Sequence, residues 1–527
     1  MSTWAGQPSI KGSSETVRMM LLTCISVGIT FTWGVEMTYC TPYLLSLGLS
    51  KGQTSLVWVA GPLSGLIVQP IVGVLADEST SKWGRRRPII VVGSILVACS
   101  LLALGFTKEI VASFVSPESA PTATIVVAVM SLYATDFAIN AVMSCSRSLV
   151  VDTLPIHQQQ TGASWSSRMG SLGHIIGYAM GAVDLLSLFG PRFGDTQFKQ
   201  LTVIAALGML LTAAITCWGV TERVLLSVPA SPHGPKTLLS APRQILATLT
   251  TLPPRIRGIC DAVFWAWIGW FPFLVYGSTW VGEIYFRHSP ASAAASNDAL
   301  GDMGRIGSTA LTIYSTVTFA SAWIMPSLIR APSTAATTKF TPRPPRWLEQ
   351  FHVSSWEVSK PDLLTAWIAS QVAFAFLMLL TPFAGSLRSA TLLVALCGVP
   401  WSFAQWAPTT FLGIEVNKLS SATSHDVELR GADEPPTTAG GAGTGELSGV
   451  YFGIMNIFTT IPQFIATMLS SVVFSVLEPG QSPELHGAAG EAPPEVSKGP
   501  NAIAVCMFIG AGAAVMSAVA TGRLRYL

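Results

Sequence analysis

The amino-acid sequence predicts an all-α polytopic membrane protein with twelve transmembrane helices in two six-helix halves. Half of the 527 residues are hydrophobic, only 11% are charged, and the mean hydropathy is +0.52. Soluble globular proteins rarely combine these values, because about a quarter of their residues are charged. Stretches such as 89–106 and 363–380 contain no charged residue and approach the roughly 20 residues that span a bilayer core.

The apolar stretches form two sets along the chain. The first set of spans is expected over 18–43, 54–76, 88–107, 122–146, 165–188 and 200–220, and the second over 258–281, 306–329, 362–384, 388–413, 447–475 and 501–521. Between them lies 221–257, rich in Pro, Ser and basic residues, as expected of a linker. The predicted domains are therefore a cytoplasmic leader (1–17), two halves (18–220 and 258–521), this cytoplasmic linker and a cytoplasmic tail (522–527).

Three hydrophilic stretches within the second half are expected to be disordered. They cover 331–360, 421–445 and 478–500, and their composition is too polar or too repetitive to form a packed core. The second of them carries a glycine-rich tract that does not follow a strand, so we do not expect it to bind phosphate.

The positions of Lys and Arg predict that both termini lie in the cytoplasm. With that topology, the outer segments hold only eight of the 30 basic residues, namely Lys51, Lys108, Arg192, Lys199, Arg287, Arg305, Arg388 and Lys498. An excess of Lys and Arg marks the cytoplasmic side of a membrane protein. The plasma membrane is the expected location, with a vacuolar or other intracellular membrane as the alternative.

Several classes of function find no support in the sequence. The net charge of +2 gives no electrostatic basis for binding nucleic acid. The eight cysteines form no Cys-x-x-Cys pair and have no clustered histidine, so we predict no metal site. No nucleophile, base and orienting group form a recognisable set, so we predict neither an enzyme nor a cofactor.

Asp136 is the strongest functional candidate, because an ionisable side chain at bilayer depth is costly. Asn140, Met143 and Arg147 follow it at helical spacing in the fourth span. Eleven residues bring Arg147 back to within about 20° of Asp136, but roughly 16 Å along the helix. We expect Asp136 to carry the transported proton and Arg147 to balance its charge. The alternatives are a hydrogen bond that only fixes helix packing and an arginine that reaches the inner interface.

Other polar residues within predicted spans are weaker candidates. Glu36 in the first span either shares the proton, binds sugar hydroxyl groups or makes a structural hydrogen bond. His174 lies among small residues where helices approach closely, and a hydrogen bond between helices is its alternative role. Trp270 belongs to the aromatic stretch 264–273, whose flat faces suit sugar rings as well as the membrane interface.

The segment between the second and third spans combines glycines with charges of both signs. It contains Gly73 and Asp77, followed by Gly84, Arg85, Arg86 and Arg87. We expect Asp77 or Glu78 to pair with these arginines and with helix ends, which would lock one conformation. A basic cluster that only holds the loop in the cytoplasm is the alternative.

At these residues the sequence resembles the major facilitator superfamily, whose loop pattern matches Gly73 to Asp77 and Gly84 to Pro88. It is more closely similar to the sucrose transporter branch, which contains plant sucrose–proton symporters, fungal glucoside symporters and related animal solute carriers. The matching segments are Thr41–Tyr43, Trp58–Pro70, Trp83–Pro88, Asp136–Asn140, Arg147–Asp152, Gly269–Phe273, Val281–Glu283 and Ile461–Gln463.

The resemblance implies a fungal-type, proton-coupled symporter of sucrose-like or maltose-like α-glucosides. Asp136 then matches the protonatable acid of the family, and Arg147 matches its essential arginine. We expect the sugar to bind near the midplane between the halves, in contact with Asn140, Gln69, His174, Trp270 and Glu283.

Some positions depart from the plant pattern. Ile139 stands where plant members carry a first asparagine, and Lys51 where they carry a histidine. Thr279 replaces an acid common in plant and animal members, and Glu283 lacks the preceding arginine. The expected partners remain a disaccharide, protons and the lipid bilayer. A sugar-sensing receptor and a proton–sugar exporter of an intracellular membrane are the alternative functions.

Overall fold

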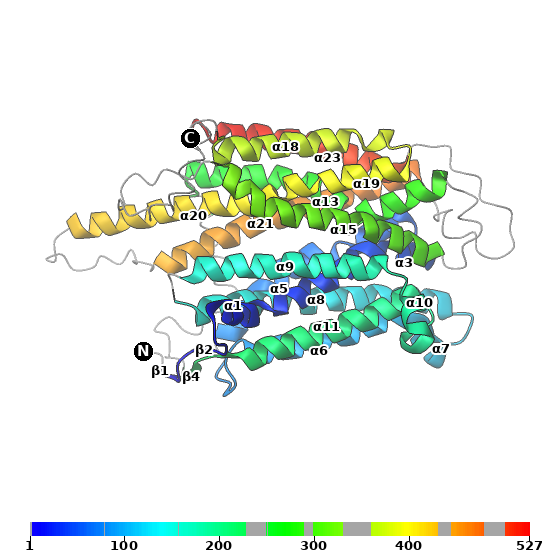
Figure 1. The fold of residues 1–527 in the computed structure, drawn as a ribbon, viewed down its shortest axis with the longest axis horizontal. Coiled ribbons are helices and arrows are strands. Elements are labelled where there is room, and N and C mark those ends of the chain that lie inside the picture. Colours follow the sequence, from blue (N-terminus) through cyan, green and yellow to red (C-terminus); the bar gives the residue numbers. More distant parts are fainter. Residues whose placement is uncertain are drawn as a thin grey trace, which may run out of the picture.

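Helices dominate the structure, which is a computed structural model of the chain. It describes residues 3–77, 79–155, 158–227, 249, 251–288, 299–329, 360–429, 444–478 and 501–527. Both chain ends lie at the same end of the helix bundle, on the left of Figure 1. We call this the proximal end and the opposite one the distal end.

The first half contains six span-forming segments. Its elements are α1 (Glu15–Thr23), α2 (Ile25–Val35), the π-helix η1 (Glu36–Cys40), α3 (Thr41–Ser46), α4 (Lys51–Val57), α5 (Ala60–Asp77), α6 (Arg87–Gly105), α7 (Thr107–Phe114), α8 (Ala120–Thr153), α9 (Gln159–Ala182), α10 (Leu185–Phe189), the short 3₁₀ turn η3 (Gly190–Phe193) and α11 (Gln197–Gly219).

The second half repeats this plan with longer helices. Its elements are α13 (Pro254–His288), α15 (Ala299–Leu328), α18 (Leu363–Leu379), η4 (Thr381–Phe383), α19 (Leu387–Leu396), α20 (Gly398–Leu429), α21 (Thr444–Leu477) and α23 (Ala502–Arg523). Helices α13, α20 and α21 contain the internal prolines Pro272, Pro408 and Pro462. Membrane helices tolerate proline because neighbouring groups satisfy the backbone carbonyl that it leaves unpaired.

These helices account for all twelve predicted spans. Among the described residues, nine helices are long and apolar enough to cross a membrane, and two bent helix pairs raise the number to 11. The first pair bends by 42° after Thr23 and the second by 79° after Ala182. The remaining predicted span corresponds to α15, which has 30 residues. The chain is therefore a multi-pass membrane protein, as predicted.

Each half has its own set of packed helices. In the first half α6 packs on α8 and α11, and α2 on α9 and α11. In the second half α13 packs on α15, α21 and α23, and α18 on α20 and α23. The halves meet where α9 contacts α15 and where α4 and α5 contact α21. Figure 1 shows α6, α8, α9 and α11 of the first half beneath α13, α18 and α23 of the second half.

Small residues allow the closest helix crossings. A Cβ atom on Gly173 of α9 would lie 2.5 Å from the Val27 carbonyl oxygen of α2. A Cβ atom on Gly269 of α13 would lie 2.7 Å from the Gly510 carbonyl oxygen of α23. Close backbone approach of this kind is how membrane helices associate without a hydrophobic driving force between them.

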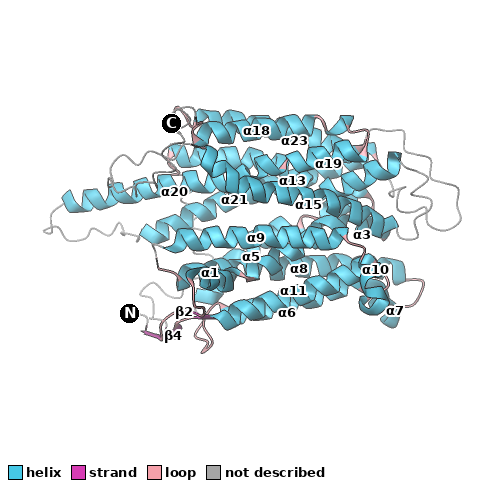
Figure 2. Cartoon of the chain, in the orientation of Figure 1, coloured by secondary structure: helices cyan, strands magenta, loops and turns pink. Residues whose placement is uncertain are grey.

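The structure adds two small antiparallel sheets at the proximal end (Figure 2). Strand β1 (Thr3–Ala5) pairs with β4 (Val224–Ser227), and β2 (Ser9–Ile10) pairs with β3 (Val220–Thr221). The Lys11 amide also donates to the Gly219 carbonyl, at 2.8 Å. The predicted leader is therefore held against the start of the predicted linker, which no apolar periodicity in the sequence indicates.

The predicted disordered stretches are only partly open to comparison. The expectation for 421–445 is wrong at its beginning, since α20 continues as a helix to Leu429, and at its end, since α21 begins at Thr444. Apart from Lys360 and Glu478, the stretches 331–360 and 478–500 lie outside the described residues, as does most of the linker.

Candidate functional site

Two buried carboxyl groups lie together inside the first half. Glu36 is 2% exposed and Asp136 is 4% exposed, and they lie close enough to interact electrostatically. One oxygen of each, Oε1 of Glu36 and Oδ2 of Asp136, is buried without a hydrogen-bond partner among the described residues. The sequence predicted both acids as candidates, and the structure brings them together from two different spans.

A local change in helix geometry surrounds Glu36. The helix of the first span widens from α2 into the π-helix η1 at Glu36 and returns to α-helical geometry in α3. Pro42 lies at the start of α3 and lacks the N–H that would continue the hydrogen-bond ladder. Such π-helical turns occur frequently at functional sites. The widened turn carries Glu36 at its beginning, facing Asp136 of α8.

An amide network lies one helical turn from Asp136. The Nδ2 of Asn140 donates to the Ser64 hydroxyl at 2.7 Å and to the Asp136 carbonyl at 2.9 Å. The Nε2 of Gln69 donates to Asn140 Oδ1 at 3.0 Å. Asn140 and Gln69, both predicted to bind sugar, thus meet between α8 and α5 beside the carboxyl pair. Amides and hydroxyls arranged in this way can also donate to and accept from sugar hydroxyl groups.

Arg147 lies on α8, eleven residues after Asp136. Its side chain is exposed, yet protein atoms surround the guanidinium closely enough to remove part of its hydration. The regular helix from Ala120 to Thr153 keeps Arg147 roughly 16 Å from Asp136 along the axis, as predicted.

His174 of α9 is half-buried in the first half. Its ring hydrogen-bonds the backbone of Gly170 and stacks on Tyr178 with a centroid separation of 5.7 Å. A Cβ atom on Gly34 would lie 3.4 Å from the Tyr178 ring, so this pair packs against the helix that carries Glu36. The alternative role predicted for His174 was a hydrogen bond between helices. The hydrogen bond to Gly170 instead stays within α9.

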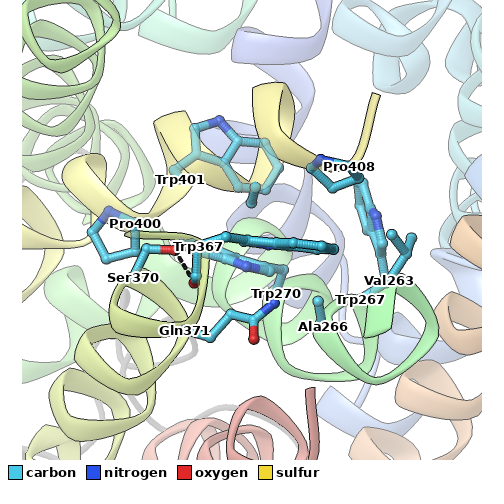
Figure 3. A pocket seen from close by; sticks show the side chains of 11 residues that line it. Val263, Ala266, Trp267, Trp270, Trp367, Ser370, Gln371, Pro400, Trp401 and Pro408 are labelled. Atoms are coloured by element: carbon cyan, nitrogen blue, oxygen red, sulfur yellow. Dashed lines mark hydrogen bonds between the residues drawn. The ribbon is translucent and has the colours of Figure 1, made fainter. Parts of the chain in front are cut away.

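Trp270 packs inside the second half. It is 3% exposed, stacks on Phe374 at 3.6 Å between ring centroids, and lies 4.8 Å from the Trp401 ring. Figure 3 shows Trp270 with Trp267, Trp367 and Trp401 around a small cavity next to Gln371. The cavity volume is about 20 Å³, enough for one water molecule and far too small for a sugar ring.

Glu283 takes part in a cluster of charges at the distal end. Its Oε1 lies 2.6 Å from Lys51 Nζ, and its Oε2 accepts a hydrogen bond from Asn501 at 2.8 Å. Lys51 also contacts Glu478, and Arg287 lies 3.1 Å from Glu478. The structure therefore places Glu283 apart from the Asn140 network, with a lysine as its immediate partner.

The predicted arginine-rich loop lies at the proximal end with partners that the sequence did not predict. Both Arg85 and Arg86 contact the Asp152 carboxylate at the end of α8, at 2.7 and 3.0 Å. Glu222, which follows α11, lies 3.6 Å from Arg87. The predicted partners cannot be compared, because the Asp77 side chain and Glu78 lie outside the described residues.

Glu222 also shapes the backbone of this loop. Its carboxylate accepts hydrogen bonds from the backbone N–H groups of Arg85, Arg86 and Arg87 at 2.8 to 3.0 Å. These groups begin helix α6, where a negative charge is favourable. Gly84 has a φ of +105°, and a Cβ atom there would lie 2.7 Å from the Glu222 carboxyl carbon. A Cβ atom on Gly73, in contrast, would meet no described atom within 4 Å, so close crossing does not explain that glycine.

Sequence reasoning missed Ser64, Glu222 and Glu478 as partners. Ser64 is one hydroxyl among many in the spans, and nothing in its spacing singles it out. Glu222 and Glu478 stand at the ends of spans, where charged residues are ordinary. The sequence did hold a signal for Glu222. It is an acid just after the sixth span, and it could have been predicted to pair with the three consecutive arginines before the third span.

Comparison with known proteins places these features in context. The family model described as "MFS/sugar transport protein" matches residues 21–256. The general alpha-glucoside permease of Schizosaccharomyces pombe is 31% identical over 511 residues, covering 88% of this chain and 87% of the permease. The sucrose transport protein SUC4 of Arabidopsis thaliana is 25% identical over 515 residues, covering 93% and 91% of the two chains.

The arrangement of helices is also found in solved structures. The crystal structure of a D-xylose-proton symporter aligns with a TM-score of 0.51, covering 96% of this chain and 97% of that chain at 14% identity. A mutant of the nucleoside transporter NupG aligns with a TM-score of 0.55, covering 96% and 99% of the two chains, also at 14% identity. At this identity the likeness concerns the fold alone. The predicted major facilitator fold is confirmed.

Proposed function

Because this chain belongs to the MFS family of sugar transport proteins, we propose that it carries an α-glucoside such as sucrose or maltose together with a proton. The observation that supports the proposal most is the pair of buried carboxyl groups on Glu36 and Asp136 beside the Asn140 and Gln69 amides. A proton site and a sugar site would then share helix α8.

The carboxyl pair supports the proton part of the proposal. Two carboxylates that share a site poor in water cannot both stay ionised at low cost, so such a pair binds a proton readily. Glu36 Oε1 and Asp136 Oδ2, which have no hydrogen-bond partner among the described residues, provide the atoms for the proton. Proton loading removes one negative charge from the interior of the first half. A conformational change that moves this site between the two sides of the membrane then carries a smaller electrostatic cost.

The amide network supports the sugar part. Asn140 lies one turn from Asp136 and donates to its backbone carbonyl, so a sugar that rearranges the amide also affects the helix turn that holds the acid. The sugar and the proton would in this way favour each other's binding, which is the reciprocity that coupled transport requires. Arg147, which lies further along α8, would balance the charge after the proton leaves.

The topology of this transporter follows from its charges. Both chain ends and the arginine-rich loop lie at the proximal end (Figure 1). Lys and Arg are enriched on this side, so we assign it to the cytoplasm. The distal end would then face the outside in a plasma-membrane protein, or the lumen of a vacuole if the protein is intracellular.

Sugar-induced proton movement tests the proposal directly. Cells that express the chain are placed in weakly buffered medium at pH 5.5 without an energy source, and maltose or sucrose is added. Symport predicts that the medium becomes more alkaline on addition of a transported glucoside and not on addition of an inert sugar alcohol. Uptake of labelled glucoside without any pH change would refute proton coupling. Absence of both uptake and pH change despite surface expression would favour the alternative function, a sugar-sensing receptor.

A further inference from the structure

Four charged side chains form a compact cluster at the distal end. Lys51 comes from the first half, and Glu283, Arg287 and Glu478 come from the second. The Lys51 ammonium contacts both carboxylates, and Arg287 contacts Glu478 at 3.1 Å. Among the described residues, the two positive and two negative charges of this cluster balance each other.

The cluster is well buried for charged side chains at the ends of membrane helices. The side chains of Lys51 and Glu283 are 4% and 1% exposed, and those of Arg287 and Glu478 are 12% and 14% exposed. Exposed ion pairs contribute little, but removing one partner of a buried pair leaves an uncompensated charge and is strongly destabilising. The state in which these four groups meet therefore depends on all of them.

The position of Lys51 on its helix supports a role across the halves. Lys51 is the first residue of α4, directly after the Ser50 cap. A positive charge is unfavourable there, because the helix N-terminus itself carries partial positive charge. The two carboxylates of the second half offset this cost. Lys51 thus has its favourable electrostatic environment only while the halves are in contact at this end.

Contacts within the second half position its two carboxylates independently of Lys51. Asn501 caps α23 with its Oδ1 and donates to Glu283 through its Nδ2. The Ala502 amide, at the start of the same helix, donates to Glu478 at 3.1 Å. Glu283 and Glu478 are therefore positioned by the N-terminus of α23, a site that favours negative charge.

Uncharged contacts between the halves lie beside the cluster. The Ser55 hydroxyl donates to the Thr467 carbonyl at 2.9 Å, and Ser471 donates to the Gly52 carbonyl at 3.2 Å. The distal ends of α4 and α21 are thus in close contact in this structure. A separate ion pair lies on the other side of the interface, where Arg305 of α15 is 2.9 Å from Asp184, which follows α9.

We propose that Lys51, Glu283, Glu478 and Arg287 form a charge lock that holds the distal end of the carrier closed. Opening the distal end separates Lys51 from both carboxylates and exposes all four charges to water. The lock is one of two arrangements that an alternating-access carrier must have, and weakening it shifts the population toward the form open at the distal end.

The Glu478 environment supports a lock that survives acid. Burial alone would raise the pKa of the Glu478 carboxyl, but Lys51, the Ala502 amide and Arg287 together lower it below its ordinary value. In the part of the chain that the structure describes, Glu283 and Cys506 are the other titratable groups near Glu478 and Lys51. The lock is therefore distinct from the proton site at Glu36 and Asp136.

Accessibility of a buried serine position tests the lock without relying on transport. Ser55 is fully buried at the interface, and Ser55→Cys is a conservative change. In intact cells we expect a membrane-impermeant maleimide to label this cysteine at least about tenfold faster when Lys51→Gln is added. Lys51→Arg keeps the positive charge and is expected to label like the parent. Lys108→Gln removes an exposed lysine and serves as the matched control.

A charge exchange separates the lock from general loosening. Lys51→Glu places three carboxylates together, whereas Lys51→Glu with Glu283→Lys restores an opposite-charge pair between positions 51 and 283, and with it one ion pair between the halves. Rapid labelling in the single variant and slow labelling in the double variant would support the lock. Glu478→Gln is measured in parallel, so that misfolding of one variant does not remove the test.

The outcomes distinguish the lock from the transport proposal. Labelling of Lys51→Gln and Glu478→Gln at the parent rate, in protein that elutes as a folded species, would overturn the lock whatever the substrate. Absence of glucoside uptake in the parent, with labelling as expected, would overturn the transport proposal and leave the lock intact.

Discussion

Glu36 and Asp136 lie within electrostatic reach of each other although 100 residues and two predicted spans separate them in the chain. The contact depends on the π-helical turn at Glu36 in the first span and on the regular helix α8. The contact places two carboxyl groups at one site, and either of them can bind a proton.

The first prediction concerns the acid of α8. Asp136→Asn keeps the size of the side chain but cannot exchange a proton, so uphill uptake of glucoside driven by a proton gradient should fall about tenfold or more. Exchange of labelled for unlabelled sugar at equal concentrations should persist, because it needs no net proton movement. Asp195→Asn, which alters an exposed acid outside the spans, is the control. Normal gradient-driven uptake by Asp136→Asn would rule out Asp136 as the proton carrier.

The amide network gives a prediction about affinity. Asn140→Ala removes the hydrogen bonds to Ser64 and Gln69 and any bond to a sugar hydroxyl. The KM for glucoside should rise about tenfold, which is the effect of losing one to two hydrogen bonds. Initial rates of uptake over a range of sugar concentrations measure it, with Gln405→Ala, an exposed residue of α20, as the control. An unchanged KM would place the sugar elsewhere.

The packing of Trp270 gives a prediction in which stability and affinity separate. Trp270→Ala removes the stacking on Phe374 and leaves a cavity, which in well-packed cores costs about 3–5 kcal/mol. The thermal denaturation temperature in detergent should fall clearly, whereas Trp218→Ala, at a position that is 63% exposed, should change it little. Because Trp270 faces the interior of the second half, the KM of the folded fraction should stay near that of the parent. A large rise in KM with unchanged stability would instead support the predicted contact between Trp270 and the sugar.

The proximal loop gives a prediction about a single methyl group. Gly84→Ala places a Cβ atom against Glu222 and at a positive φ, which is strained for a residue with a side chain. We expect lower expression and a lower denaturation temperature. Gly385→Ala, where nothing lies within 4 Å of the added carbon, is the matched substitution and should behave as the parent. Equal stability of the two variants would contradict the Glu222 contact.

The charge lock has a predicted pH dependence. The pKa of Glu478 lies below its ordinary value of 4.5, so its stabilising effect is complete above that value and is lost only as the pH falls through the lowered pKa. Distances between spin labels across the distal ends of α4 and α21 should therefore be the same at external pH 7 and pH 5. A distal end that opens between these two pH values would show that a different group controls it.

The sequence and the structure agree best where the physical signal is continuous. Twelve apolar stretches have a length set by the bilayer, so their number could be read from hydropathy alone. Asp136 could be singled out because an acid in an apolar helix is costly. The pairing of Asp136 with Glu36, and of Asn140 with Ser64, depends on the rotation and approach of separate helices, which a periodic pattern does not specify.

The partners of the charged residues were the hardest part to predict. Glu283 could be singled out only through the family resemblance, and its pairing with Lys51 depends on contact between the halves in one conformation. The sequence indicated only an acid near the arginines of the proximal loop as their partner, and it did not indicate Asp152 and Glu222, which reach them from the ends of α8 and α11. Charges at helix ends meet according to tertiary structure, which composition does not encode.

Uptake of labelled sucrose, maltose and glucose at external pH 5 and pH 7, with and without an uncoupler, decides whether the chain is a proton-coupled disaccharide symporter. We expect cells that express the chain to take up a disaccharide faster at pH 5 than at pH 7, and we expect the uncoupler to abolish the difference. Uptake that ignores both pH and uncoupler, or absence of disaccharide uptake by protein shown to be at the cell surface, would contradict that function.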